Sequence, residues 1–444
     1  MPYQQGNRLP AERASKLGHL EVIQSDLVQR LCESFNDPTV NEHTGMGTNW
    51  EDLPLNGKEL KIVFASDGSI QIIENPNPPF KAIAFVKSAL LKIDQYALSK
   101  IDKDTPNPLA LRDLMKESAL YHSTVFPLRN VFIEGKTNYD SIREILYESL
   151  KDKGHNDSLG GAMMETLKWI AYEKWLDEPK VQLEEFGCPN CFKDVATLPF
   201  DAENGLCPSC NGEIYITDMF GLHQNMNEDL APNQVASDYM EISATLMIFT
   251  AIRYFWQERR TTLSDCLFVK DGPLALRATL AKLSAPIRRF FEYAQKNGLE
   301  IALIGQEKTG QFVDHFELIG RNAPSGTCFI PDNDYIQKHI KHNRTTAIYG
   351  ADTNYGAKVF LKLNEYHKMV ISVPTGKRGE FVEAPLMNRL IAFKDIIATL
   401  PSIISNRFEG ALLPIELANN VASLSTYPSA KVLTLFADEL KGGT

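Results

Sequence analysis

Two short apolar segments, far apart in the chain, each end in an aspartate followed by a glycine, and this pair limits the fold more than any other feature. The first, Lys61–Gln71, reads K-I-V-F-A-S-D-G-S-I-Q, and the second, Cys266–Leu274, reads C-L-F-V-K-D-G-P-L. Such short apolar runs are typical of strands buried on both faces of a sheet. We predict that the two strands lie side by side and bring Asp67 and Asp271 to one metal site. Asp67 would then end its strand, with Ile70–Ile73 as a new strand after a glycine turn.

A long apolar segment, Val235–Gln257, leads into the second of these strands. It is apolar nearly all round, so we predict a central, buried helix. Glu241 stands near its start, and a lone carboxylate on a buried helix is costly unless it is paired or bound to metal. The alternatives are a first-turn acid near solvent that interacts with the helix dipole, or Asp238 or Glu258 as the ligand instead.

Three carboxylates on two strands and one helix would form a hard, oxygen-rich site. Such a site prefers Mg²⁺ or Mn²⁺, and with two ions about 4 Å apart it activates water for phosphodiester cleavage. The strand–Asp, helix–Glu, strand–Asp order is the ribonuclease-H-like plan. The predicted class is therefore α/β, a ribonuclease-H-like mixed sheet with flanking helices.

Four of the seven cysteines form two Cys-x-x-Cys pairs, Cys188 with Cys191 and Cys207 with Cys210. Two such pairs joined by a short hairpin give four tetrahedral thiolates, which suits zinc. We predict a structural zinc ribbon over residues 181–213, because four thiolates leave no open position for substrate. Iron in a rubredoxin-like site and a redox dithiol are the alternatives.

Composition indicates an ordinary soluble protein of more than one lobe. The 444 residues are 43% apolar and 23% charged, as in globular proteins. The net charge of −10 argues against non-specific coating of nucleic acid but leaves a nuclease open. The sequence has no apolar run that would span a bilayer, and Met1–Arg30 lacks a signal-peptide core, so we expect a cytoplasmic protein with no membrane partner.

The remaining chain divides by pattern into five predicted parts. Residues 1–58 form an N-terminal helical arm, 80–180 a mostly helical insertion and 426–444 a C-terminal tail helix, while 59–79 and 214–425 form the core.

Apolar residues at helical spacing predict one helix in the arm and four in the insertion. The arm helix, Ala11–Phe35, either packs on the core or docks a partner. The insertion helices are predicted at Lys81–Leu98, Pro108–Tyr121, Tyr139–Lys151 and Leu159–Leu176.

Two basic features are candidates for contact with a nucleic-acid backbone. Lys308 lies in the glycine loop 305–310, and Lys341 and Arg344 belong to the cluster I-Q-K-H-I-K-H-N-R at Ile336–Arg344. Lysines and arginines on a solvated surface would give the same pattern.

Several of these motifs resemble the NurA nucleases, which work with the HerA hexameric ATPase. The resemblance rests on V-F-A-S-D-G-S at Asp67, on L-F-V-K-D-G-P-L at Asp271 and on the helix that carries Glu241. It extends through L-I-G-Q-E-K-T-G near Lys308 and F-V-E-A-P near Glu383, which would be a further site residue. It covers residues 60–75 and most of 235–425, and leaves the zinc ribbon and the insertion outside.

This resemblance implies a ribonuclease-H-like homodimer that cleaves DNA with manganese, in end processing or phage defence. It implies that Asp67, Glu241 and Asp271 are the metal ligands. The family's final motif reads G-Y-P-x-P-L followed by Ala-His, but this chain has Ala411 in place of the tyrosine and Asn419 in place of the histidine. Asn419 would ligate a metal only weakly, through its amide oxygen. Two rivals stay open: a catalytically weak scaffold that docks on the ATPase, and a free-standing phosphohydrolase.

Overall fold

The computed structural model describes most of the chain. The described residues are 25–35, 48–75, 77–78, 80–96, 119–152, 163–226, 231–342, 347–375, 385–405, 410–425 and 429–441. The chain divides into two compact units, Met1–Gly47 and Thr48–Thr444.

In the first unit the described element is α3 (Asp26–Glu33). It confirms a helix in the last part of the predicted Ala11–Phe35, and the earlier part lies outside the described residues. No residue of α3 is buried. The predicted arm boundary at residue 58 lies ten residues beyond the first residue of the second unit, Thr48.

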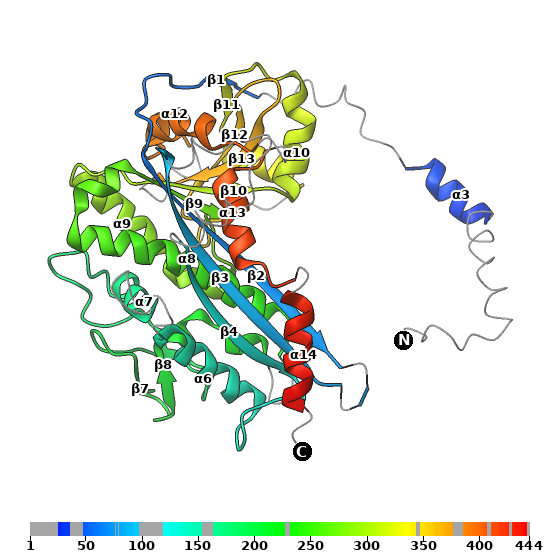
Figure 1. Cartoon of the computed structure of the whole chain (residues 1–444), viewed down its shortest axis with the longest axis vertical. Coiled ribbons are helices and arrows are strands. Elements are labelled where there is room, and N and C mark those ends of the chain that lie inside the picture. Colours follow the sequence, from blue (N-terminus) through cyan, green and yellow to red (C-terminus); the bar gives the residue numbers. More distant parts are fainter. Residues whose placement is uncertain are drawn as a thin grey trace. The chain divides into compact units, whose positions relative to one another are not determined.

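The second unit is built on one nine-stranded mixed sheet, in the order β1-β11-β12-β13-β10-β9-β2-β3-β4 (Figure 1). Its strands are β1 (Glu51–Asp52), β2 (Ile62–Glu74), β3 (Ala82–Asp94), β4 (Ala119–Arg129), β9 (Cys266–Asp271), β10 (Ala302–Glu307), β11 (Thr327–Phe329), β12 (Ala357–Lys362) and β13 (Lys368–Val373). Strands β2, β9 and β10 run parallel, and the other neighbours pair antiparallel. The α/β class with a large mixed sheet is thereby confirmed.

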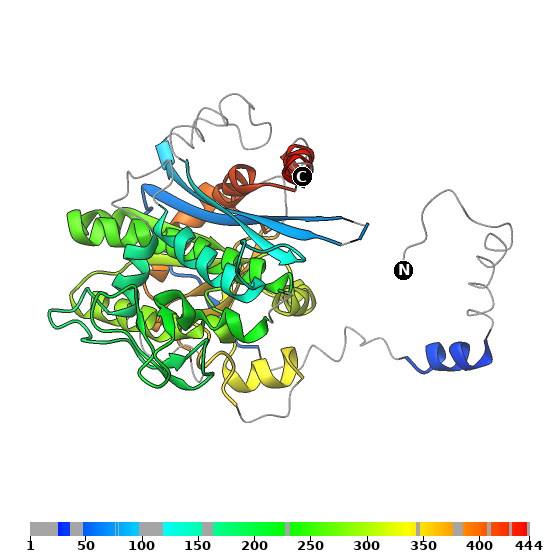
Figure 2. The same ribbon diagram turned by 90° about the horizontal axis from the view of Figure 1, so that it is seen from below.

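Helices cover both faces of this sheet (Figure 2). On one face lies α8 (Gln234–Glu258), and on the other lie α13 (Leu413–Ala422) and α14 (Ser429–Lys441). The further helices are α6 (Asn138–Lys151), α7 (Met163–Ala171), α9 (Ser284–Lys296), α10 (Gln311–Ile319), α11 (Asn333–Tyr335) and α12 (Phe393–Ile403).

Alternate residues of β2 point to opposite helices, as the pleat of a strand requires. The Ser66 hydroxyl donates to the Ala244 carbonyl of α8 at 3.0 Å. Ser69 points the other way, and its hydroxyl accepts from the Leu424 amide at 3.0 Å, just beyond α13. Gly68 permits the close approach of α8, since a Cβ there would lie 2.4 Å from the Met240 Cγ.

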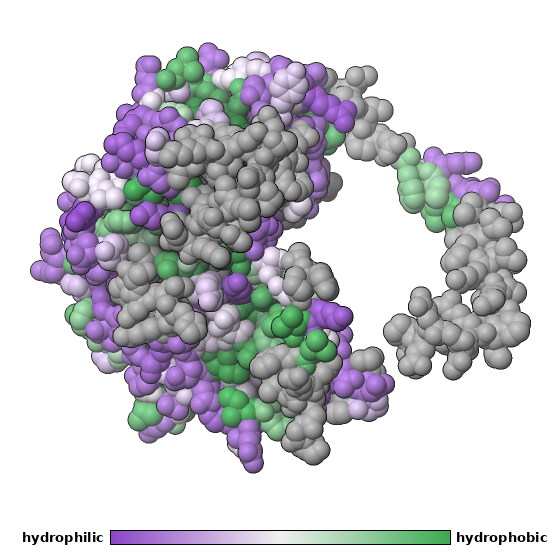
Figure 3. All heavy atoms as spheres, in the orientation of Figure 1, coloured by the Kyte–Doolittle hydropathy of each residue, from purple (hydrophilic) through white to green (hydrophobic). Residues whose placement is uncertain are grey.

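Helix α8 confirms the predicted central helix at Val235–Gln257. It is long and apolar enough to cross a membrane, but 83% of its most apolar window is buried inside the protein. A core helix explains that composition. On the face seen in Figure 3, the described surface of the second unit is largely hydrophilic at its outline, with smaller hydrophobic groups between.

The helical insertion predicted at 80–180 is wrong in its first half. Lys81–Leu98 forms strand β3, and the described end of Pro108–Tyr121 begins β4, so both ranges extend the main sheet. Alanine and leucine favour helices, but pairing of β3 along the whole of β2 overrides that preference. The buried residues Ala82, Ala84 and Val86 alternate with more exposed ones, which is a strand period.

The second half of the insertion agrees with the prediction. Helix α6 matches Tyr139–Lys151, and α7 lies within Leu159–Leu176. The tail helix predicted in 426–444 is α14.

The glycine turn expected after Asp67 is also wrong. Strand β2 continues without a break through Asp67 and Gly68 to Glu74. The predicted second strand, Ile70–Ile73, is the far half of β2, which stays paired to β3. Asp67 therefore lies in mid-strand.

Candidate functional site

Strands β2 and β9 lie side by side and parallel, as predicted, and their aspartates are neighbours. The last registered pair is Ser66 with Lys270, so Asp67 and Asp271 follow one position later and point to the α13 face. Asp67 is 5% exposed, and its Oδ1 accepts from the Gly68 amide at 2.6 Å. The structure thus brings together the two carboxylates that the sequence singled out.

The surroundings of Asp67 disfavour the ionised form of its carboxyl group. Burial and the negative charge of Asp271 raise the pKa of Asp67 to about 7, and its hydrogen bond to Asp271 acts in the same direction, against the lowering effects of Lys308 and the Gly68 amide. Two neighbouring carboxyl groups repel each other when both are ionised, which raises the pKa of at least one of them. A cation placed between them would remove that repulsion, because opposite charge favours the ionised form.

Gln306 on β10 lies next to Asp271 in the sheet, on the side away from Asp67, and the sequence did not identify it as a site residue. It is registered with Asp271 and fully buried, and its Nε2 donates to the Gly410 carbonyl. Its Oε1 has no hydrogen-bond partner among the described residues. An orphaned amide oxygen beside two carboxylates suits a hard cation, so these residues fit Mg²⁺ or Mn²⁺. A signal was present in the sequence, since Gln306 follows an apolar run as Asp271 does.

A cavity of about 650 Å³ opens at the two aspartates. Its lining includes both aspartates, Glu241 and Lys270. Tyr349 and Arg277 add an aromatic and a basic side chain to the wall. Acidic, basic and aromatic groups in one concave site make it the candidate active site.

Glu241 reaches this cavity from the opposite face of the sheet. It lies on α8, and its Oε2 is 3.3 Å from the Arg277 Nε. Burial raises the pKa of Glu241, while the charges of Lys270 and Arg277 lower it. Glu241 is therefore not the solvent-exposed acid of a first helical turn that was the alternative prediction, since only 16% of its side chain is exposed.

The structure also describes Asp238 and Glu258, the two alternatives to Glu241 as a metal ligand. Asp238 pairs with Arg277 and accepts from the Gln234 side chain at 2.6 Å. Glu258 is exposed at the end of α8 and is not among the cavity-lining residues.

The predicted basic residues are only partly described. The Lys308 Nζ lies 2.9 Å from the Oδ1 of Asp271, which lines the cavity. Lys341 lies over the rings of Phe312 and Tyr349, at 5.5 and 5.2 Å from their centroids. Arg344 lies outside the described residues.

The remaining predicted site residues either do not line the cavity or lie outside the described residues. Asn419 is exposed on α13 and does not line the cavity. Ala411 is buried. Glu383 lies outside the described residues.

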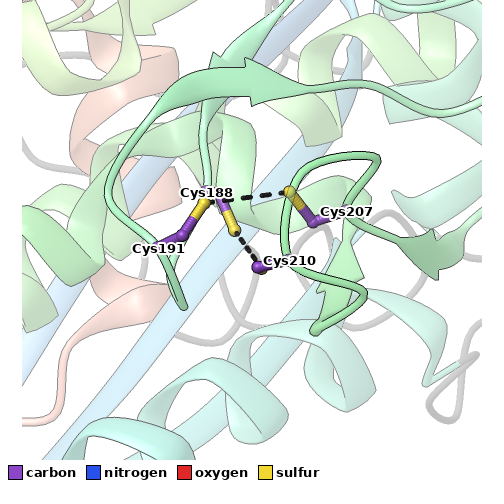
Figure 4. Close-up of side chains that lie close together, drawn as sticks. All are labelled: Cys188, Cys191, Cys207 and Cys210. Atoms are coloured by element: carbon purple, nitrogen blue, oxygen red, sulfur yellow. Dashed lines mark hydrogen bonds between the residues drawn. The ribbon is translucent and has the colours of Figure 1, made fainter.

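The four predicted cysteine ligands converge (Figure 4). Their sulfurs all lie within 4.8 Å of one another, with 3.8 Å between Cys188 and Cys210 and 4.0 Å between Cys191 and Cys207. In the described part of the chain, the carboxylates of Asp67, Glu241 and Asp271 do not form such a group.

Sulfur geometry and backbone both fit a tetrahedral metal. Zn–S bonds of about 2.3 Å place tetrahedral sulfurs about 3.8 Å apart. The hairpins β5–β6 (Phe186–Gly187 and Asp194–Ala196) and β7–β8 (Asn204–Leu206 and Glu213–Tyr215) carry the two pairs. In each, an amide two residues on donates to a sulfur at 3.4 Å, Asn190 to Cys188 and Gly212 to Cys210.

Comparisons with known proteins add little to this geometry. No protein-family model and no curated protein matches the sequence. Among solved structures, a crystal structure of NurA aligns at a TM-score of 0.28 with 10% identity, over 97% of this chain and 98% of that chain. A crystal structure of NurA bound to dAMP and manganese aligns at 0.27 with 10% identity over the same shares.

Proposed function

We propose that the protein is a Mn²⁺- or Mg²⁺-dependent deoxyribonuclease that hydrolyses phosphodiester bonds at the Asp67–Asp271 pair. The observation that carries the proposal is this carboxylate pair, in which Asp67 is buried with a raised pKa and Asp271 is 33% exposed, at a cavity whose lining also holds Arg277. Perturbed acids in a cleft are typical of catalytic sites, and two carboxylates are hard ligands for these ions.

The side chains around the pair have separate roles in this proposal. Asp67, Asp271 and the Gln306 oxygen would hold the cation, which when bound supplies Lewis-acid polarisation of the phosphate. Lys308, which pairs with Asp271, would turn to a phosphate oxygen when metal neutralises the carboxylate. Lys341 and Arg344 would hold the DNA backbone, whose charge attracts them.

The sheet supports the ribonuclease-H-like plan as part of the proposal. An acidic strand, β2, is followed by the acidic helix α8 and then by the acidic strand β9, which returns beside β2 in parallel. This order agrees with the plan inferred from the sequence. We also propose zinc as the occupant of the cysteine site, since the sulfur spacing suits it.

The partners are proposed from the resemblance of the motifs. They are DNA, a HerA-type hexameric ATPase and a second copy of the chain, with a cytoplasmic role in end processing or phage defence. Helix α3 is our candidate for ATPase docking, because Leu27 and Leu31 are 58% and 48% exposed one helical turn apart.

The decisive experiment is digestion of plasmid and linear DNA with Mn²⁺ by Asp67→Asn and Asp271→Asn. Both variants should fold and lose cleavage, because each removes a carboxylate ligand. Asp177→Asn, a change at an exposed aspartate outside the cavity, should cleave as the unaltered protein does. Full cleavage by both cavity variants would end the proposal.

One observation favours the scaffold alternative. Asp271 and Glu241 are already paired with Lys308 and Arg277 in the described structure, so the cavity is charge-compensated by the protein's own cations. A scaffold would form the ATPase complex but leave DNA intact with Mn²⁺. Turnover of small phosphodiesters without the ATPase would instead favour a free-standing phosphohydrolase.

A further inference from the structure

We propose that Arg277 binds the phosphate next to the scissile one, so that the cavity acts on a nucleotide strand with at least two phosphates rather than on an isolated phosphodiester. This inference rests on the proposed function and specifies its substrate class.

Arg277 lines the cavity and is joined to α8 by two ion pairs. Its Nη1 donates to the Oδ1 of Asp238, and its Nε lies 3.3 Å from the Oε2 of Glu241. The side chains of Asp238 and Glu241 are 3% and 16% exposed, against 48% for Arg277. The guanidinium group is therefore held from the α8 side, while about half of the side chain stays accessible.

These ion pairs leave part of the guanidinium group unused. The group has five N–H donors in a planar fork. Nη1 and Nε face the two acids, and Nη2 has no hydrogen-bond partner among the described residues. A role limited to neutralising the buried Asp238 would need only Nη1 and no accessible side chain. The free edge of the fork suits a phosphate, which arginine binds through parallel hydrogen bonds.

The backbone at Arg277 is fixed as well. The amide of the preceding residue, Leu276, donates to the Thr353 carbonyl at 2.9 Å, and the Arg277 carbonyl accepts from the Leu280 amide at 2.8 Å. Leu276 and Thr353 also line the cavity. Because the residue is held both at its backbone and at its guanidinium group, it loses little conformational freedom when a ligand binds.

The ion pairs also indicate which phosphate Arg277 contacts. In the described structure Arg277 pairs with the acids of α8 and with neither Asp67 nor Asp271. The Lys308 Nζ, in contrast, lies 2.9 Å from the Asp271 Oδ1. Lys308 would therefore contact the scissile phosphate beside the proposed metal ion. Arg277, on the α8 side of the same cavity, then faces a second phosphate, which the next nucleotide of a strand supplies.

The test compares three thymidine dinucleotides as substrates of the full chain with Mn²⁺. TpT has one internal phosphate, and pTpT and TpTp have a second one at the 5′ or the 3′ end. For the unaltered protein, kcat/KM for one of the two longer substrates should exceed that for TpT by about tenfold or more, as expected for a hydrogen bond to a charged group. A ratio of about one for both would overturn the inference.

Two variants of Arg277 show whether this residue causes the preference. Arg277→Gln should lower the ratio to about one. Arg277→Lys keeps a positive charge beside Asp238, so it should fold even if the glutamine variant does not, but it lacks the planar fork and should lose most of the preference. An unchanged ratio in either folded variant would overturn the inference.

Arg289→Gln is the matched control. Arg289 is 41% exposed and its Nη2 lies 2.6 Å from the Oε1 of Glu173, a side chain that is only 4% exposed. Neither residue is among those that line the cavity. This variant should keep the ratio of the unaltered protein. A lowered ratio here would show that the loss of any arginine from a buried acid changes it, and would overturn the inference.

Binding without Mn²⁺ separates this inference from the proposed function. The three dinucleotides compete with a fluorescein-labelled oligothymidylate, and displacement is followed by anisotropy. The unaltered protein should bind one of the two-phosphate dinucleotides more tightly than TpT, and Arg277→Gln should bind all three alike. Equal binding by the unaltered protein would overturn the inference. A retained binding preference without cleavage of any dinucleotide or longer DNA would instead refute the proposed function.

Discussion

Replacing Asp67 by asparagine should stabilise the metal-free protein at pH 8 and remove its response to manganese. Asp67 is 5% exposed beside Asp271, and burial together with the Asp271 charge raises its pKa to about 7. At pH 8 the folded chain therefore contains a carboxylate that its surroundings disfavour. Asparagine keeps the shape of the side chain and removes this charge.

The magnitude follows from the pKa. In the folded protein the Asp67 pKa lies at about 7, against 3.8 for the ordinary group, and each unit is worth about 1.36 kcal/mol. The folded state binds the extra proton between these values, so the free energy of unfolding falls as pH rises through that window. The full loss, reached above pH 7, is at most about 4 kcal/mol.

The assay is urea unfolding at pH 5 and pH 8. Chelators are omitted because they would remove the zinc that we propose for the cysteine site. At pH 5 only the lower part of the window between 3.8 and about 7 has been passed, so the free energy of unfolding of Asp67→Asn should exceed that of the unaltered protein by about 1.6 kcal/mol, less than half of the full difference. At pH 8 the variant should show the full difference, while Asp177→Asn should change neither value.

Manganese should reverse this order at pH 8. Mn²⁺ at 100 times its dissociation constant stabilises a folded protein by about 2.7 kcal/mol, and Asp67→Asn should gain little of this. If the variant is less stable than the unaltered protein by the same amount at both pH values, the Asp67 charge is not strained and the reasoning fails.

Three further variants test the neighbouring features. Gln306→Leu should fold and bind Mn²⁺ about tenfold more weakly by calorimetry, as it loses an oxygen ligand; equal affinity would show that the orphaned oxygen faces no metal. Lys308→Ala should weaken DNA binding, measured by fluorescence anisotropy, and reduce the salt slope by about one; an unchanged slope would exclude a phosphate contact. Cys207→Ser should lower zinc content by mass spectrometry and the melting temperature; full zinc retention would refute tetrahedral thiolate binding.

The sequence predicted those parts of the site that depend on local pattern. An apolar run that ends in aspartate identified β9, and Asp67 and Asp271 do lie on adjacent parallel strands. The cysteine pairs were equally clear, because the spacing of each Cys-x-x-Cys pair alone determines its geometry. The α/β class followed from elements such as the buried strand β9 and the apolar helix α8, both of which are present.

The errors arose where tertiary pairing decides the outcome. The composition of Lys81–Leu98 suits a helix, but the segment pairs with β2 over its whole length. That pairing also keeps β2 straight through Gly68, where a turn was expected. The face of the sheet on which Glu241 lies depends on how α8 packs, with Ala244 against Ser66, and no local pattern records that choice.

The uneven pairing around the two aspartates has a consequence for metal choice. The backbone at Asp67 is registered with Ala89 of β3, and that ladder continues to the end of β2, whereas Asp271 is the last residue of β9 and precedes Gly272 at a φ of 83°. Asp67 therefore lies within a continuously paired strand, whereas Asp271 lies at the start of a turn. Ions of different radius would be accommodated from the Asp271 side, so changes to that turn should alter the ranking of Mg²⁺ against Mn²⁺ more than changes along β2.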